Sequence, residues 1–194
     1  MNAIDLAFEK FPILQTDKVI FRQAKDSDYR GIYEIYCEEE AVRYQQTMPM
    51  ETMEQAHKSV AAFLRGFEEK RFIRWCIEDK SSSKLIGLIA LNNFDRKNFN
   101  ATIGYMLNKK YWRKNVMSEV GEVIIDYGFE TLTLHRISAS IHPDNIASIS
   151  LCRKLGFKRE GVNKEAVYNK EINKYEDRVM FSKLNNSEVD VLRK

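Results

Sequence analysis

Two short segments of the chain carry side chains whose types and spacing could do chemistry. The first, residues 106–119, places four basic side chains in a loop between a predicted strand and a predicted helix: Lys109, Lys110, Arg113 and Lys114. Free backbone N–H groups and the positive end of a helix dipole make such a junction an anion site. Phosphate binding is one interpretation, and a solvated basic turn before an ordinary helix is the other. The segment lacks GxxxxGK[ST], so the sequence does not indicate a Walker-type nucleotide site.

The second segment runs from His142 to Phe157. Its residues Asn145, Ser148 and Cys152 are spaced i, i+3 and i+7, which places them on one face of a predicted helix. A hydroxyl that faces inward needs a partner, either a backbone carbonyl or a ligand. The alternative is that Asn145 only caps the helix and that Ser148 bonds back to it.

Both segments follow a predicted strand, and this shared position connects them. Ligands of open α/β sheets bind outside the carboxyl ends of the strands. The first segment could therefore hold phosphates, and the second could present polar groups to the rest of an elongated ligand.

The elements that position these segments are read from periodicity. Alternating or continuous apolar runs predict strands at 19–22, 73–78, 85–91, 102–107, 136–142, 165–168 and 178–184. Helical spacing predicts helices from Asp26 or Ser27 to Tyr36, from Thr52 with Gln55 completing a capping box, over 116–127, and from Pro143 to a stop at Gly156. The order β-α-α-β-β-β-α-β-α-β-β predicts an α/β (α+β) fold, a mixed sheet with helices on both faces.

Composition bounds the class of protein. With 194 residues and a mass of 22.8 kDa, the chain suits one domain. The net charge of +3 is too small to indicate nucleic-acid binding. The longest apolar run, Leu85–Leu91, is far shorter than the roughly 20 residues of a membrane span, and Asp5 and Glu9 argue against a signal peptide. Three scattered cysteines fit a reduced, cytoplasmic setting and no metal-binding pattern.

Five stretches together resemble the GNAT (Gcn5-related N-acetyltransferase) superfamily, and most of all its RimJ/RimL-like branch, which acts on ribosomal-protein N-termini and similar amines. The stretches are Thr16–Arg22 (T-E-R-L-x-L-R in the branch), Ile103–Leu107 (I-G-Y-x-L), Trp112–Glu119 (W-G-K-G-x-x-[ST]-E), Asn145–Ser148 (N-x-x-S) and Lys154–Gly161 (K-L-G-F-x-x-E-G). Each motif is weak singly, whereas their order and spacing are specific. The resemblance covers about residues 16–184.

The resemblance implies a GNAT fold of about seven mostly antiparallel strands, with a V-shaped gap between the strands that end at Leu107 and His142. It implies one domain over 16–184. The residues themselves predict an irregular or helical arm before it (1–15) and a polar tail after it (185–194). The resemblance also implies acetyl-CoA as the donor, an amine as the acceptor, no metal, and a monomer or homodimer. The residues expected to bind acetyl-CoA are Met106, Leu107, Asn108, Trp112, Arg113, Lys114, Asn115, Val116, Met117, Ser118, Asn145, Cys152 and Lys154.

The loop departs from the family pattern at Arg113 and Asn115, where the family usually has Gly, and at Met117, where it often has Ala. Asn tolerates a positive φ better than most residues, so Asn115 is expected to replace Gly. Arg113 must either adopt an ordinary backbone conformation or carry strain. If it fits, its guanidinium could donate a charge-assisted hydrogen bond to a phosphate.

The expected catalytic residues are Ser148, Asn145 and His142. Many family members carry a Tyr on the last helix as the acid for the thiolate, but Cys152 stands near that place here, so Ser148 takes over the role by analogy with the branch. His142 ends its strand at the gap and is a candidate base or water holder, with an ordinary strand-end residue as the alternative. Glu165 is a further candidate base whose register is open. The implied reaction is direct attack of a primary amine on the thioester; the alternative is a noncatalytic acyl-CoA-binding module of the same fold.

Overall fold

The computed structural model describes residues 2–45 and 47–185. Its helices are α1 (Ala3–Leu6), α2 (Tyr29–Tyr36), α3 (Glu39–Val42), α4 (Met53–Glu68), α5 (Val116–Asp126) and α6 (Ile146–Lys154). Its strands are β1 (Leu14–Gln15), β2 (Val19–Arg22), β3 (Phe72–Asp79), β4 (Lys84–Asp95), β5 (Asn100–Leu107), β6 (Arg136–Ile141), β7 (Lys158–Asn169) and β8 (Lys174–Leu184). Two 3-10 turns (Asp26–Asp28, Lys109–Tyr111) and a π-helical turn (Tyr127–Thr131) complete the described elements.

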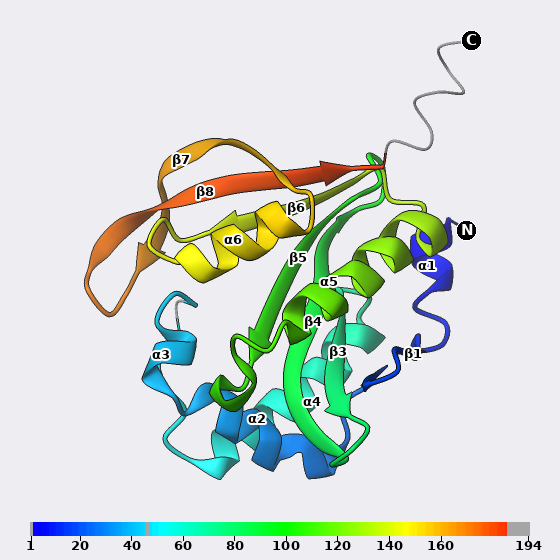
Figure 1. Cartoon of the computed structure of the whole chain (residues 1–194), viewed down its shortest axis with the longest axis vertical. Coiled ribbons are helices and arrows are strands. Elements are labelled where there is room, and N and C mark those ends of the chain that lie inside the picture. Colours follow the sequence, from blue (N-terminus) through cyan, green and yellow to red (C-terminus); the bar gives the residue numbers. More distant parts are fainter. Residues whose placement is uncertain (1, 46, 186–194) are drawn as a thin grey trace.

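All eight strands form one mixed sheet in the order β1-β2-β3-β4-β5-β6-β8-β7, and only the β5–β6 pair is parallel (Figure 1). The expected fold class and element order are confirmed. The sheet has one strand more than expected, because the two-residue β1 pairs with β2 at the edge.

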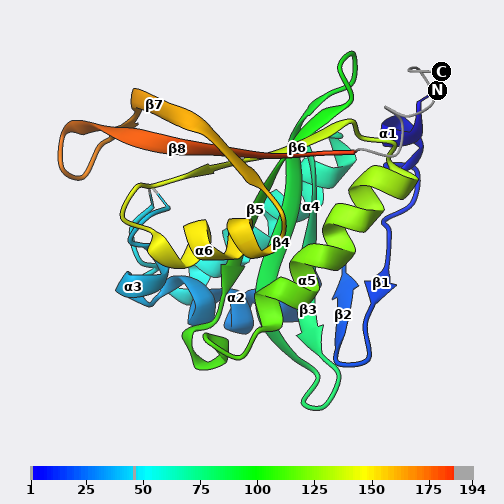
Figure 2. The same ribbon diagram turned by 45° about the horizontal axis from the view of Figure 1, so that its top comes forward.

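The parallel pair at the centre of the sheet separates soon after it forms. β5 and β6 pair only from Asn100–Thr102 to Arg136–Ser138, although β5 continues to Leu107 and β6 to Ile141. Figure 2 shows β6 and β8 turning away from β5. This divergence is the expected V-shaped gap, and it opens the carboxyl ends of two central strands.

Helices cover both faces of the sheet, as expected. On one face, α2 and α4 bury Ile32, Ile35 and Val60 against apolar side chains of β3, β4 and β5. On the other face, α5 and α6 pack against side chains that include Trp75, which is fully buried. The alternation of apolar and other residues along β3 therefore serves two cores, one on each side of the sheet.

Local signals in the sequence determine several element ends. Thr52 caps α4, and the Gln55 side chain accepts from the Thr52 N–H, so the predicted capping box is confirmed. After α6 the chain reverses at Gly156 with φ of 81°, a conformation that favours glycine. The last two strands are longer than predicted, because β7 is mostly exposed and interrupted by bulges, which weakens its apolar pattern.

The N-terminal arm, expected to be irregular or helical, contains α1 and belongs to the main core. Ile4 is fully buried, Phe8 packs on Phe67, and the Trp75 Nε1–H donates to the carbonyl of Pro12 at 2.8 Å. At the other end, Asn185 donates its N–H to the carbonyl of His135. The rest of the expected polar tail, 186–194, lies outside the described residues.

Within 2–45 and 47–185, no helix combines the length and the apolar character that crossing a bilayer requires. The three cysteines are free thiols, and burial raises the pKa of Cys76 to about 12.

Candidate active site

A cavity of about 610 Å³ lies beside the gap between β5 and β6. Four parts of the chain line it: the end of β5, the loop and first turn of α5, the start of α6, and the segment Glu40–Gln45 around the end of α3. Figure 2 shows α6 and α5 side by side, with α3 below the first turn of α6. The cavity thus joins both chemistry-bearing segments of the sequence.

The loop before α5 has an unusual backbone. Arg113 and Asn115 adopt φ values of 60° and 63°, in the left-handed region. The expectation for Asn115 is confirmed, and Arg113 takes the strained alternative at a cost of roughly 1–2 kcal/mol. Within the described chain, no acceptor is assigned to the backbone N–H groups of 113–117; the first to donate are those of Ser118 and Glu119, to the Asn115 carbonyl. A concave run of free N–H groups at a helix start binds anions.

Two of the four basic side chains of this loop are engaged elsewhere. The Lys109 ammonium lies 2.9 Å from the Glu40 carboxylate, and the Lys110 ammonium 3.8 Å from that of Glu34. Arg113 is exposed at the cavity, and the Lys114 ammonium lies over the ring of Tyr111. Arg113 and Lys114 therefore remain without a paired carboxylate in the described chain, whereas Lys109 and the 78% exposed Lys110 are partly neutralised.

The edge of β5 that faces the gap presents backbone groups to the cavity. The Asn108 N–H donates to the Ile86 carbonyl on β4, so the alternation of an antiparallel ladder turns the polar groups of Tyr105 and Leu107 toward β6. The Leu107 carbonyl already accepts from the Trp112 indole N–H at 2.8 Å. Tyr105 is thus the residue whose N–H and carbonyl face the widening gap.

Two of the residues that line the cavity, Tyr105 of β5 and Ser148 of α6, carry hydroxyl groups. Asn145 caps α6 by accepting from the Ser148 N–H at 3.1 Å, as its capping interpretation predicts. The Tyr105 hydroxyl is buried and forms no regular hydrogen bond in the described residues, and the Ser148 hydroxyl is its polar neighbour. Burial raises the pKa of this phenol, and the nearby Ser148 hydroxyl opposes the shift.

Most, though not all, of the site residues predicted from the sequence lie together at the cavity. Those that line the cavity are Met106, Leu107, Trp112, Arg113, Asn115, Val116, Met117, Ser118, Asn145 and Ser148. Asn108 lines a smaller hollow beside Glu34, while Lys154 hydrogen-bonds to Asn115 through its ammonium. Cys152 is buried in the core, where burial raises its thiol pKa to about 11.

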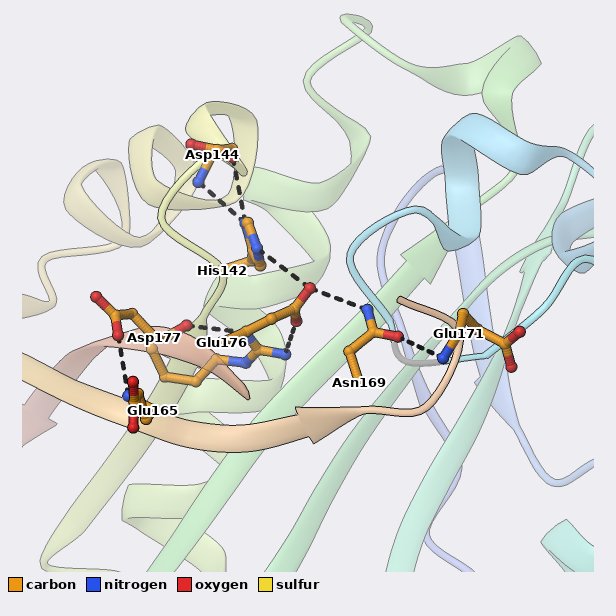
Figure 3. A network of polar contacts seen from close by, with 8 residues as sticks. His142, Asp144, Glu165, Asn169, Glu171, Glu176 and Asp177 are labelled. Atoms are coloured by element: carbon orange, nitrogen blue, oxygen red, sulfur yellow. Dashed lines mark hydrogen bonds and ion pairs between the residues drawn. The ribbon is translucent and has the colours of Figure 1, made fainter. Parts of the chain in front are cut away.

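His142 does not line the cavity itself. It lies behind the residues that do, and it belongs to the polar network shown in Figure 3. Its ring stacks on Tyr44, which lines the cavity, at 5.1 Å between centroids. Its Nδ1 accepts from the Asp144 backbone N–H at 3.1 Å, and its Nε2 lies 3.7 Å from the Glu176 carboxylate. Because a backbone N–H can only donate, this bond uses the Nδ1 lone pair of the neutral ring, and the proton lies on Nε2.

Glu176 is the centre of the same network. Its carboxylate accepts from Asn169 at 2.9 Å and from Arg178 at 3.0 Å. Burial alone would raise its pKa, but the hydrogen bonds from Asn169 and Arg178 and the positive charge of Arg178 outweigh burial and lower it. Glu176 is therefore a stable carboxylate anion that ties β8 to the turn before α6.

Glu165, the other candidate base, lies on a bulge of β7. Its backbone N–H donates to the Asp177 carboxylate at 2.9 Å, and its φ is 48°. Figure 3 shows it on the far side of the network from His142. This position does not bring the Glu165 carboxylate to the cavity.

The sequence patterns did not predict the part of the site that α3 and the turn after it form. Glu40, Arg43 and Tyr44 come from α3 and the turn after it. A four-residue helix is too short to show a period, so no pattern in the sequence could have indicated it. Tyr105 was read only as part of a strand motif, although its type and place beside Leu107 were visible.

The hydrogen-bond donors at the cavity suit an elongated ligand with phosphates at one end. The free N–H groups of 113–117 and the exposed Arg113 lie at the α5 side of the cavity, and the unpartnered Tyr105 hydroxyl lies at the α6 side. The divergence of β5 from β6 and the cavity lined by free backbone N–H groups are the two features that define the class of the GNAT N-acetyltransferases.

Comparison with known proteins agrees. Residues 18–158 match the family model of the acetyltransferase (GNAT) domain, and the chain belongs to this family of N-acetyltransferases. It is 40% identical over 158 residues to the uncharacterized N-acetyltransferase YoaA of Bacillus subtilis, covering 81% of this chain and 89% of that one. It is 28% identical over 169 residues to the [ribosomal protein uS5]-alanine N-acetyltransferase of Escherichia coli, covering 78% and 81%.

A solved structure of RimL, a ribosomal L7/L12 alpha-N-protein acetyltransferase in complex with coenzyme A, superposes with a TM-score of 0.78. The match covers 91% of this chain and 100% of that chain at 20% sequence identity, and it shows a shared fold.

Proposed function

We propose that the protein transfers an acetyl group from acetyl-CoA to a primary amine. One observation supports this most directly: the run of backbone N–H groups from 113 to 117, without acceptors in the described chain, opens onto the cavity where β5 and β6 part. Acetyl-CoA is the donor that this family membership implies, and it supplies an acetyl group activated as a thioester.

The residues present fit this donor from end to end. The N–H groups of 113–117 and the Arg113 guanidinium hold the diphosphate, as a helix start does. The Tyr105 backbone pairs with the pantetheine arm along the free edge of β5. Asn145 and Ser148 then lie at the thiol end, where the Ser148 hydroxyl hydrogen-bonds to the leaving sulfur. Cys152 supports this wall from the core, and Lys154 holds the loop through Asn115.

The amine enters from the side of the cavity that Glu40, Arg43 and Tyr44 line. We assign deprotonation of the amine to water and not to His142, because the Nδ1 lone pair of His142 is used by Asp144. His142 instead fixes Tyr44 at the wall of the cavity. A protein N-terminus, a polyamine or another small amine could meet these requirements. The similarity to the [ribosomal protein uS5]-alanine N-acetyltransferase of Escherichia coli favours a protein N-terminus.

A transfer assay tests this function. The release of free thiol from acetyl-CoA is followed with three acceptors: peptides with a free N-terminus, spermidine, and a simple alkylamine. Mass spectrometry then locates the acetyl group. Acetylation of the α-amino group of the peptides would support transfer to a protein N-terminus. Acetylation of spermidine or of the alkylamine would instead support transfer to that amine. Tight binding of acetyl-CoA without transfer to any amine would contradict the proposal and favour the acyl-CoA-binding module.

A further inference from the structure

The Ser148 hydroxyl is the polar neighbour of the Tyr105 hydroxyl, but the two form no regular hydrogen bond. The Tyr105 side chain projects from β5 toward α6 at the cavity, and its oxygen is buried without a regular hydrogen bond in the described chain. A buried hydroxyl without a partner costs free energy, and a phenylalanine would fill the same space without this cost. Stability of the fold therefore gives no reason for a tyrosine at this position.

The neighbours of this hydroxyl indicate what it could bind. Ser148 and Cys152 of α6 are the side chains that act on the Tyr105 phenol. Cys152 is a buried thiol in the core, and Ser148 lines the cavity. Two hydroxyl donors, one from β5 and one from α6, thus face a common space.

The place of this pair along the cavity identifies the ligand atom. The diphosphate of an extended donor lies at the amides of 113–117, so its thiol end lies toward the other side, at Tyr105 and Ser148. Hydrogen-bond donors fixed where negative charge develops are among the strongest contributions to catalysis. A phenol that keeps its proton is suited to this task, since it can donate without being consumed.

Resting on the proposed function, we infer that Tyr105 is a catalytic residue whose hydroxyl donates a hydrogen bond to the sulfur as the thioester breaks. The C–N bond forms and the C–S bond breaks, and the bonding electron pair moves to the sulfur. The proton that leaves the amine nitrogen passes through water and restores the thiol, while Tyr105 keeps its own proton.

Tyr105→Phe tests the inference with a readout besides activity. Coenzyme A is titrated with base in the presence of a saturating amount of protein, and its thiolate is followed by ultraviolet absorbance. Loss of one hydrogen bond to the thiolate should lower the ionisation constant of the bound thiol about tenfold relative to the parent. In acetyl transfer, kcat should fall about 100-fold or more, while acetyl-CoA affinity changes less than about threefold. The unfolding midpoint should change little, because the lost hydroxyl forms no regular hydrogen bond in the described chain.

Tyr127→Phe is the matched control. Tyr127 is another half-buried tyrosine on the same face of the sheet, it packs against Trp75 at 5.6 Å between centroids, and burial raises its pKa to about 12. It contacts the core and not the cavity, so its variant should match the parent in both readouts.

The inference is overturned if the thiol of bound coenzyme A ionises alike in the parent and in Tyr105→Phe, or if kcat stays within about twofold. Failure of the parent itself to bind coenzyme A would overturn the proposed function and this inference with it. A parent that binds and turns over, beside an unchanged Tyr105→Phe variant, would overturn the inference alone.

Discussion

The imidazole of His142 and the backbone N–H of Asp144 form a hydrogen bond of 3.1 Å in which Nδ1 is the acceptor. This bond defines the tautomer of His142 and directs the Nε2–H toward the half-buried carboxylate of Glu176, 3.7 Å away. A histidine at the end of a strand beside a gap has the position of a general base, but its lone pair is not free to take a proton. Its contacts make it a support for Tyr44 and for the turn that leads into α6.

Replacement of His142 distinguishes a support from a base. In His142→Asn the side-chain carbonyl can still accept from Asp144, so we expect kcat to stay within about threefold of the parent and the acidic limb of the pH–rate profile to persist. His142→Ala should raise KM for the amine through the freed Tyr44 ring, with a smaller change in kcat. A loss of about 100-fold or more in kcat for both variants, together with loss of the acidic limb, would show that His142 is the base.

The loop before α5 stores strain that a glycine would remove. Arg113→Gly should raise the free energy of unfolding by about 1 kcal/mol, because Arg113 has a φ of 60°. The same variant should weaken acetyl-CoA binding through loss of the guanidinium. Urea denaturation and calorimetry measure the two effects on one preparation.

Asn115 provides the comparison for this loop. Both Asn115→Gly and Asn115→Ala remove the oxygen that accepts from Lys154, but only glycine relaxes the φ of 63°, so Asn115→Ala should be less stable than Asn115→Gly by about 1 kcal/mol. A destabilising Arg113→Gly substitution would mean that contacts of the arginine outweigh its backbone strain.

Glu176 makes the stability of the protein depend on pH. Its folded pKa is lowered from the ordinary value of 4.5, so the ionised group stabilises the fold above about pH 4.5, and this contribution is lost as the pH falls through the lowered pKa. Glu176→Gln should therefore be less stable than the parent at neutral pH, and the difference should shrink on acidification. Urea denaturation at about pH 7 and about pH 3.5 measures it. An equal difference at both pH values would contradict this role.

Sequence patterns predicted the fold well where local chemistry decides the structure. The alternation from Ile73 to Glu78 gave β3, and the pairing of Thr52 with Gln55 located the start of α4. β1 and α3 escaped prediction, because two- and four-residue elements depend on distant partners and show no period. The length of β7 was underestimated, since an exposed strand has few apolar residues.

Within the candidate site, sequence spacing located the loop and α6 but not the pairing of their charges. Lys109 was expected at the phosphates, and only the position of α3 reveals that Glu40 binds it. The burial of the Tyr105 hydroxyl depends equally on how α6 packs against β5. Such contacts join residues far apart in the sequence, so no local pattern encodes them.

The N-terminal arm should be required for stability. Ile4 is fully buried, and Ile4→Ala should destabilise the protein by about 2–5 kcal/mol through lost burial and the cavity left behind. Leu6 lies two residues away and is 51% exposed, so Leu6→Ala should lower the free energy of unfolding far less. Guanidinium unfolding of both variants checks this, and equal, small effects would show that the arm is not part of the core.

The central claim is that acetyl-CoA binds in the cavity between β5 and α6. The direct measurement is a calorimetric titration of acetyl-CoA into the parent, Ala147→Trp and Ser150→Trp. Ala147 lines the cavity, so an indole at this position should raise Kd at least about tenfold, a loss of about 1.4 kcal/mol. Ser150 is exposed elsewhere on α6, and its variant should bind like the parent. Equal affinities in all three proteins would contradict the claim, as would a parent that does not bind.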